Sequence, residues 1–172
     1  LTLREVALFG MLGALTFGAK VAMSGLPNIE PVSLMVMLFA VVFGFKAFYP
    51  IYLYVLLEIL LYGISFWNIN YLYVWAILAL LAIAMRRVKN PIAWALLSGG
   101  FGLAFGLFCA PVYAFVGGSF DYALRWWIAG FPFDVSHAIG NAVIALVLFV
   151  PLRKLLENPE LLEKPFSEEV EY

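Results

Sequence analysis

The sequence predicts an all-α integral membrane protein, a bundle of six transmembrane helices with both termini in the cytoplasm. Of its 172 residues, 65% are hydrophobic and only 12% are charged, and the mean hydropathy is +1.00. Soluble domains average about 45–50% apolar and about 25% charged residues. A membrane-spanning helix needs about 20 apolar residues, so the length leaves room for roughly six helices and no soluble catalytic domain.

Six apolar stretches are expected to be helical, because an open sheet edge cannot satisfy its polar groups in lipid. They are 5–26, 31–45, 46–66, 71–86, 91–117 and 133–152. The first is interpreted as a retained helix, because it lacks the short apolar core and small-residue cleavage site of a signal peptide. The second is expected to start with Pro31 at its first helical position. The fifth is expected to bend or end early at Pro111.

Basic residues alternate between the connections and predict the topology. One set of connections and ends holds Arg4, Lys46, Arg86, Arg87, Lys89, Arg153 and Lys154. Arg125 is the single basic residue of the opposite connections, which are 26–30, 66–70 and 117–132. The positive-inside rule therefore places both termini in the cytoplasm. Residues 1–156 are predicted to form the six-helix domain, and residues 157–172 an acidic cytoplasmic tail.

Ionisable side chains inside membrane spans are costly and therefore mark candidate functional sites. They are Lys20, Glu58, Asp134 and His137, with Asn141 as a neutral companion. At about 1.5 Å per residue, all lie in the outer third of the predicted bundle. A structural alternative stays open: Glu58 and Lys20 could pair with each other, or the carboxyl groups could be neutral through a raised pKa. His137 and Asn141 could bond across helices.

The three outer connections are expected to complete a ligand pocket. Asn28 and Glu30 project from a loop stiffened by two prolines. The next connection interleaves amides with aromatic rings, which suits a planar ligand or an interfacial aromatic belt. The third is expected to act as a lid. Besides Asn28, Glu30, Asp134, His137 and Asn141, the predicted substrate-binding residues are Trp67, Asn68, Asn70, Tyr71, Tyr113, Trp126 and Trp127.

Two stripes of small residues at four-residue spacing allow close helix approach. The first is Gly10, Ala14 and Gly18, and the second is Ser98, Gly102, Gly106 and Ala110. Two stripes in a six-helix protein suggest that one packs internally and the other faces a partner protein.

Several functions are not expected. Cys109 is the single cysteine and His137 the single histidine, which argues against a disulfide and a metal site. No G-x-x-x-x-G-K-[ST] phosphate-binding loop occurs. We expect no cofactor, no nucleic-acid partner and no catalytic activity of the chain itself.

These features together resemble the substrate-binding S component of an energy-coupling factor (ECF) vitamin transporter. The resemblance covers residues 4–156. It is carried by Leu26-Pro27-Asn28-Ile29-Glu30-Pro31-Val32, by the apolar helix ending Val42-Phe43-Gly44, and by Asn70-Tyr71-Leu72-Tyr73-Val74-Trp75.

The resemblance implies a multi-pass protein of the bacterial plasma membrane that captures a vitamin outside the cell. It also implies docking, through Gly10, Ala14 and Gly18, on a membrane scaffold subunit carried by two ATPases. The chain is most similar to cobalamin-specific members, and folate, pantothenate, pyridoxine and riboflavin remain alternatives. Two other classes stay open: a membrane enzyme, and a structural subunit of a membrane complex that needs no pocket.

Overall fold

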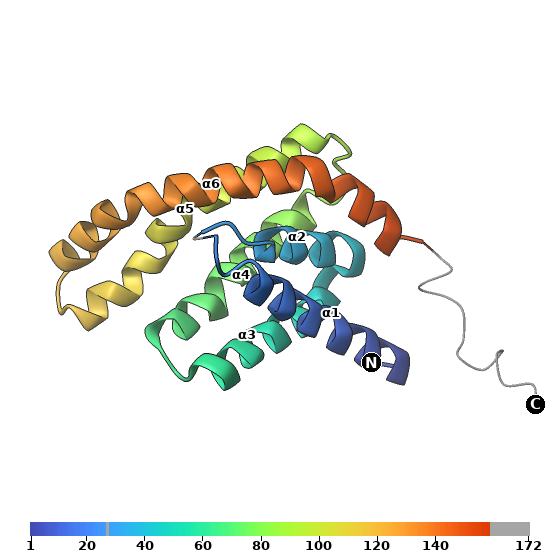
Figure 1. Ribbon diagram of the computed structural model, residues 1–172, viewed down its shortest axis with the longest axis horizontal. Coiled ribbons are helices and arrows are strands. Elements are labelled where there is room, and N and C mark those ends of the chain that lie inside the picture. Colours follow the sequence, from blue (N-terminus) through green and yellow to red (C-terminus); the bar gives the residue numbers. More distant parts are fainter. Residues whose placement is uncertain (27, 159–172) are drawn as a thin grey trace, which may run out of the picture.

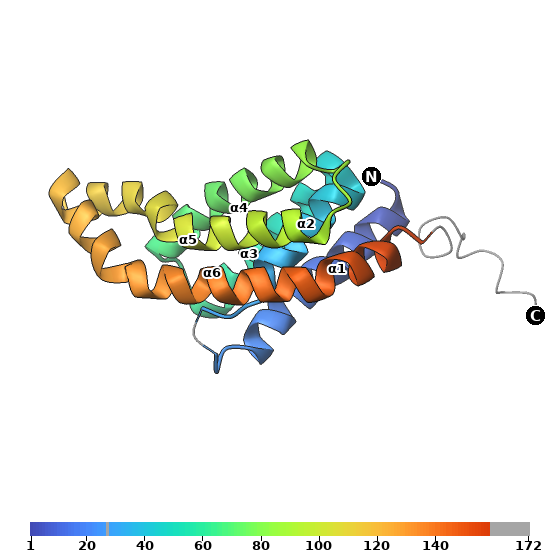
Figure 2. The same cartoon turned by 90° about the horizontal axis from the view of Figure 1, so that it is seen from above.

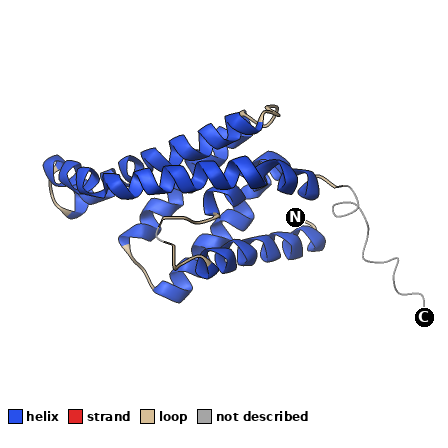
Figure 3. Cartoon of the chain, turned by 45° about the horizontal axis from the view of Figure 1, so that its top comes forward, coloured by secondary structure: helices blue, strands red, loops and turns tan. Residues whose placement is uncertain are grey.

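The computed structural model describes residues 1–26 and 28–158, and every regular element in them is helical (Figures 1 and 3). The elements are α1 (Leu3–Ala22), α2 (Val32–Phe43), the 3-10 helix η1 (Gly44–Ala47), α3 (Phe48–Tyr62), α4 (Phe66–Ala84), α5 (Pro91–Val116) and α6 (Phe120–Leu156). The predicted all-α class is confirmed for this part of the chain. Most of the predicted acidic tail, residues 159–172, lies outside the described residues.

Five helical stretches within the described residues are long and apolar enough to cross a membrane. One of them, Val32–Tyr62, contains α2, η1 and α3. The chain reverses direction within it, because Glu30 before α2 and Glu58 near the end of α3 both lie within 4.0 Å of the Lys20 Nζ. Gly44 makes the turn with a φ of 58°, a left-handed conformation that favours glycine.

Helix α2 is the central helix of the bundle. Its twelve residues include Val36, Met37 and Phe39, each at most 1% exposed. At 1.5 Å per residue it is only about 18 Å long, and a short helix that is apolar on every side belongs in a protein interior. Helix α2 begins one residue after Pro31, which is the N-cap rather than the predicted first helical residue.

Two predicted loops are wrong, because both are helical. Helix α4 already begins at Phe66, where Ser65 donates its backbone N–H and its hydroxyl to the Asn68 side-chain oxygen. Helix α6 begins at Phe120, where the Ser119 hydroxyl accepts the N–H of Tyr122 at 3.1 Å. These caps satisfy backbone groups that a helix start leaves unpaired. The predicted lid at 117–132 is therefore mostly the first turns of α6.

Prolines interrupt neither of the last two helices. Pro111 lies inside α5 and Pro132 inside α6. The expected early end of α5 at Pro111 is wrong, because α5 continues to Val116. Helices of membrane proteins tolerate proline where neighbouring groups satisfy the freed carbonyls.

The start of α1 and the end of α6 lie at the same end of the bundle (Figures 1 and 2). At this end Lys46 pairs with Glu5 at 2.5 Å, and Arg153 donates to the carbonyls of Arg86 and Val88 at 3.2 Å. We call this the basic end, because it gathers Arg4, Lys46, Arg86, Arg87, Lys89, Arg153 and Lys154.

Helices α5 and α6 pack closely along much of their length (Figure 2). A side chain at Gly102 would lie 2.9 Å from backbone atoms of His137 and Ala138, so only glycine fits there. The small stripe of α5 therefore packs inside the molecule. In α1 the stripe faces outward: Ala14 and Gly18 are exposed, and Gly10 and Gly18 have open space where a side chain would stand.

This packing predicts different effects of alanine at two neighbouring glycines. Gly102→Ala should lower the unfolding free energy in detergent by about 1–3 kcal/mol, because the added methyl overpacks the α5–α6 contact. Gly100→Ala meets open space and should be neutral or stabilising by up to ~1 kcal/mol, as the better helix former. Thermal unfolding of the two variants measures this, and equal melting temperatures would contradict the assigned packing.

Candidate functional site

A cavity of about 770 Å³ lies at the end of the bundle opposite the basic end, between the end of α1, the end of α3 and the start of α4. Its walls come from the last turn of α1, the following loop, the end of α3, the start of α4, the second half of α5 and the first half of α6. Pockets that enclose small molecules typically measure about 300–1,000 Å³. The cavity is therefore large enough for a small organic ligand.

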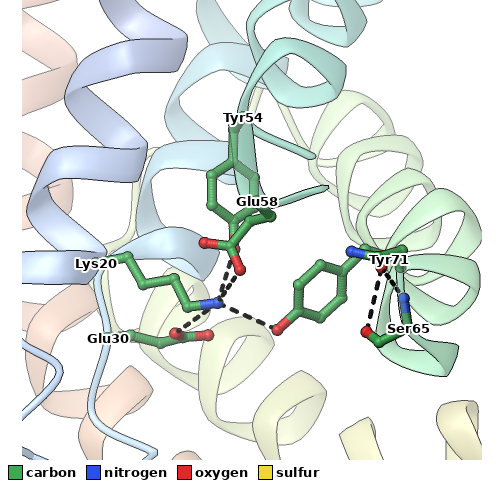
Figure 4. Close-up of polar contacts among 7 residues, drawn as sticks. Lys20, Glu30, Tyr54, Glu58, Ser65 and Tyr71 are labelled. Carbon is green, nitrogen blue, oxygen red and sulfur yellow. Dashed lines mark hydrogen bonds and ion pairs between the residues drawn. The ribbon is translucent and has the colours of Figure 1, made fainter. Parts of the chain in front are cut away.

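One wall is an ion cluster centred on Lys20 (Figure 4). The Lys20 Nζ donates to Glu58 at 2.9 Å, to the Tyr71 hydroxyl at 3.2 Å and to the Tyr54 hydroxyl at 3.3 Å. Glu30 lies 3.9 Å from the same nitrogen. Groups from α1, the 23–31 loop, α3 and α4 thus converge on one ammonium.

Helical periodicity explains why these groups meet. Lys20 follows Thr16 by four residues and continues the buried face of α1. Tyr54 and Glu58 are likewise four residues apart on α3, and such pairs share a helix face. Glu30 is held by the loop, where burial raises the pKa of its carboxyl and the nearby Lys20 charge opposes that shift.

A second wall is aromatic. The Trp126 ring from α6 stacks on Tyr113 from α5 with 3.7 Å between centroids. Trp67 from α4 lies edge-on to Tyr113 at 6.2 Å and tilted to Trp126 at 6.1 Å. Trp67 and Trp126 line the cavity, and Tyr113 supports them from behind.

The third wall is polar and belongs to α6. Asp134 accepts the backbone N–H of Gly106 at 3.0 Å, and the missing side chain of Gly106 leaves the room for this contact. One helical turn further, His137 lies edge-on to Phe105 at 4.9 Å. Both Asp134 and His137 are buried.

Several buried polar atoms of the lining have no hydrogen-bond partner among the described residues. They are Glu58 Oε1, Trp127 Nε1, Asp134 Oδ2 and His137 Nε2. An unpaired buried polar group costs about 1–3 kcal/mol. These atoms are therefore the natural contacts for a polar ligand or for water in the cavity.

Most of the predicted site residues are brought together here. The cavity is lined by Asn28, Glu30, Trp67, Asn68, Tyr71, Trp126, Trp127, Asp134 and His137. Asn28 adopts a φ of 59°. The side-chain oxygen of Asn68 is occupied by capping α4. That these residues bind a substrate stays a prediction.

Three predicted site residues do not line the cavity. The Asn70 side-chain oxygen accepts the Tyr73 hydroxyl at 3.0 Å. Tyr113 stands behind Trp126, as described above. The Asn141 amide donates to the Ser33 hydroxyl at 2.9 Å and to the Ser98 carbonyl at 3.4 Å, so it joins α6 to α2 and α5. The predicted ligand contact of Asn141 is replaced by the structural alternative, a bond across helices.

Sequence reasoning left the role of Lys20 and Glu58 open and missed other lining residues. The ion pair between them is present and also lines the cavity. A role of the two residues in ligand binding stays a prediction. Phe105 and Gly106 were missed as lining residues because an apolar helix gives no sign of which turn faces a cavity. Their contacts to the two polar residues of α6, described above, become visible only when α5 and α6 are placed together.

Within residues 1–26 and 28–158, no group of three or more His, Cys, Asp or Glu could hold a metal ion. The free Cys109 is buried. Comparison of the chain with protein-family models, with curated proteins and with solved structures gave no match.

The ion cluster predicts a large stability effect of Lys20. Lys20→Met leaves two carboxylates facing each other without a cation, and removing one partner of a buried pair typically costs about 3–5 kcal/mol. Lys46→Met removes a pair at the basic end whose lysine is half exposed, and should cost below about 1 kcal/mol. Unfolding in detergent measures both variants, and equal losses would contradict a structural role of the cluster.

Proposed function

We propose that this chain is the substrate-capturing S component of an ECF-type vitamin importer. In this role it binds a vitamin at the cavity from outside the cell. It then delivers the vitamin inward after docking on a membrane scaffold that two ATPase subunits drive. In this proposal the six helices lie in the bacterial plasma membrane, with the short α2 inside the bundle, and the basic end and both termini face the cytoplasm.

One observation carries the proposal: α1 has two faces with different properties. Its buried face ends in Lys20, which reaches into the cavity. Its opposite face presents Gly10, Ala14 and Gly18 with nothing from this chain packed against the two glycines. A smooth helix surface allows another helix to approach closely. The same helix can therefore contact both a ligand and a scaffold.

The cavity favours this role over that of a purely structural subunit. A structural subunit needs no pocket, whereas this chain has one with unpaired polar atoms and aromatic walls. The resemblance favours cobalamin, with folate, pantothenate, pyridoxine and riboflavin as alternatives. Mass spectrometry of small molecules that co-purify with the detergent-solubilised chain tests this choice.

The energy source provides the next prediction. Because the sequence has no phosphate-binding loop of the G-x-x-x-x-G-K-[ST] type, vesicles that contain the chain alone should not concentrate the co-purified vitamin. Vesicles that also contain the scaffold and ATPase subunits of its host should concentrate it only when ATP is supplied. Concentrative uptake by the chain alone, driven by an ion gradient, would contradict the proposal.

The outward face of α1 provides a further prediction. Gly18→Leu or Ala14→Trp should abolish uptake while ligand binding by the isolated chain stays within about twofold, a difference below ~0.5 kcal/mol. Gly100→Leu is the matched control, since Gly100 is an exposed helical glycine of α5 with open space around it. Pull-down of the scaffold and ligand titration distinguish the two effects. If the α1 variants lose ligand binding but still bind the scaffold, the assigned docking face is wrong.

A further inference from the structure

We infer that the cavity selects an organic cation, a vitamin-sized molecule that carries a protonated or quaternary nitrogen on or next to a planar ring. The inference rests on the proposed function, because it takes the cavity as the substrate site. It concerns the charge of the ligand, which neither the resemblance nor the fold supplies.

The charges around the cavity are unbalanced. The charged lining residues are one lysine, Lys20, and three acids, Glu30, Glu58 and Asp134, a formal net charge of −2. No arginine of the described part of the chain lines the cavity. A cleft with a net negative charge attracts cationic ligands.

Lys20 is not available to an anionic ligand. An ammonium has three N–H donors, and those of Lys20 are directed to Glu58, Tyr54 and Tyr71. Its charge is also shared with Glu30. A ligand carboxylate or phosphate would have to displace one of these partners and would stand beside two carboxylates, the buried Glu58 and the partly exposed Glu30.

Asp134 is the carboxylate left for a ligand. It is 6% exposed, and none of the ion pairs of the described residues includes it. Its Oδ1 accepts the Gly106 N–H, whereas its Oδ2 has no partner in good hydrogen-bond geometry. The Trp127 indole N–H, a donor from α6, lies beside the same carboxyl. A buried charge without a counter-charge is costly. A cationic nitrogen of the ligand at Oδ2 would remove that cost.

The aromatic wall suits the same ligand. Trp67, Trp126 and Trp127 line the cavity together with Asp134. Aromatic faces attract cations, most strongly the face of tryptophan, and they stack on planar rings. A volume of about 770 Å³ accommodates a ligand of ordinary vitamin size. Cobalamin is several times larger, so the cationic ligand inferred here is a different choice from the cobalamin that the resemblance favours.

A matched set of tricyclic probes tests the inference. Near neutral pH, 9-aminoacridine is a cation, acridine is neutral and acridine-9-carboxylate is an anion, and all share one planar ring system. Each is titrated into the purified full chain in detergent, and quenching of tryptophan fluorescence is followed. We expect 9-aminoacridine to bind about tenfold or more tightly than either of the others.

Variants locate the charge that is responsible. Asp134→Asn should remove most of the preference for 9-aminoacridine while leaving acridine binding unchanged, which also shows that the variant is folded. Glu30→Gln, in the loop, should weaken 9-aminoacridine binding in the same direction. Asp121→Asn is the matched control, because Asp121 lies on the same helix but is exposed and pairs with Arg125 away from the cavity lining. It should bind all three probes as the unmodified chain does.

The inference is overturned by equal affinities for the three probes, by a preference for the carboxylate, by an unchanged preference in Asp134→Asn, or by no binding of any probe. Competition in ATP-driven vesicle uptake separates this inference from the proposed function. Uptake that is inhibited best by the carboxylate would keep the transporter role and remove the cationic ligand. Selective 9-aminoacridine binding without any uptake would keep the cationic ligand and remove the transporter role.

Discussion

The cost of an unpaired charge inside an apolar bundle is the constraint on which the cavity end of this protein depends. Lys20 can be buried only because Glu58, Glu30, Tyr54 and Tyr71 surround its ammonium. Those partners come from two other helices and a loop, so neutralising one charge fixes the relative positions of four segments. The cavity is the space that remains between this cluster and the α5–α6 pair.

Helices α5 and α6 depend on a different constraint, the close approach of their two backbones. Glycine at positions 102 and 106 lets the two helix backbones come near enough for Asp134 to reach the Gly106 N–H. The carboxylate is thereby held at one oxygen and left open at the other. Gly106 and Asp134 therefore both pack α5 against α6 and line the cavity. A substitution that loosens the helix contact also changes the direction in which the carboxylate points.

The sequence was sufficient to predict the all-helical class and the charged residues of the cavity lining, because charges such as Lys20 and Asp134 in apolar helices are too costly to occur without a role. It was insufficient for the starts of α4 and α6. Residues 66–70 and 120–132 are rich in polar and aromatic residues, and the second segment also contains Pro132, which together indicate loops. Caps at Ser65 and Ser119 and tertiary packing nevertheless stabilise helix there. Asn141 was misplaced because spacing identifies a helix face but not which neighbour that face meets.

The length of α6 determines how a ligand can reach the cavity. Its 37 residues extend for about 56 Å, more than the roughly 40–45 Å of a whole bilayer including its headgroups. With the Leu156 end at one surface, Trp126 lies about 45 Å along the helix axis, at the level of the opposite headgroups. In the proposed orientation, the cavity-lining residues near the start of α6 therefore lie at headgroup level. A strongly hydrated solute would then reach them without partitioning into hydrocarbon, and membrane fluidity would have little influence on its association rate.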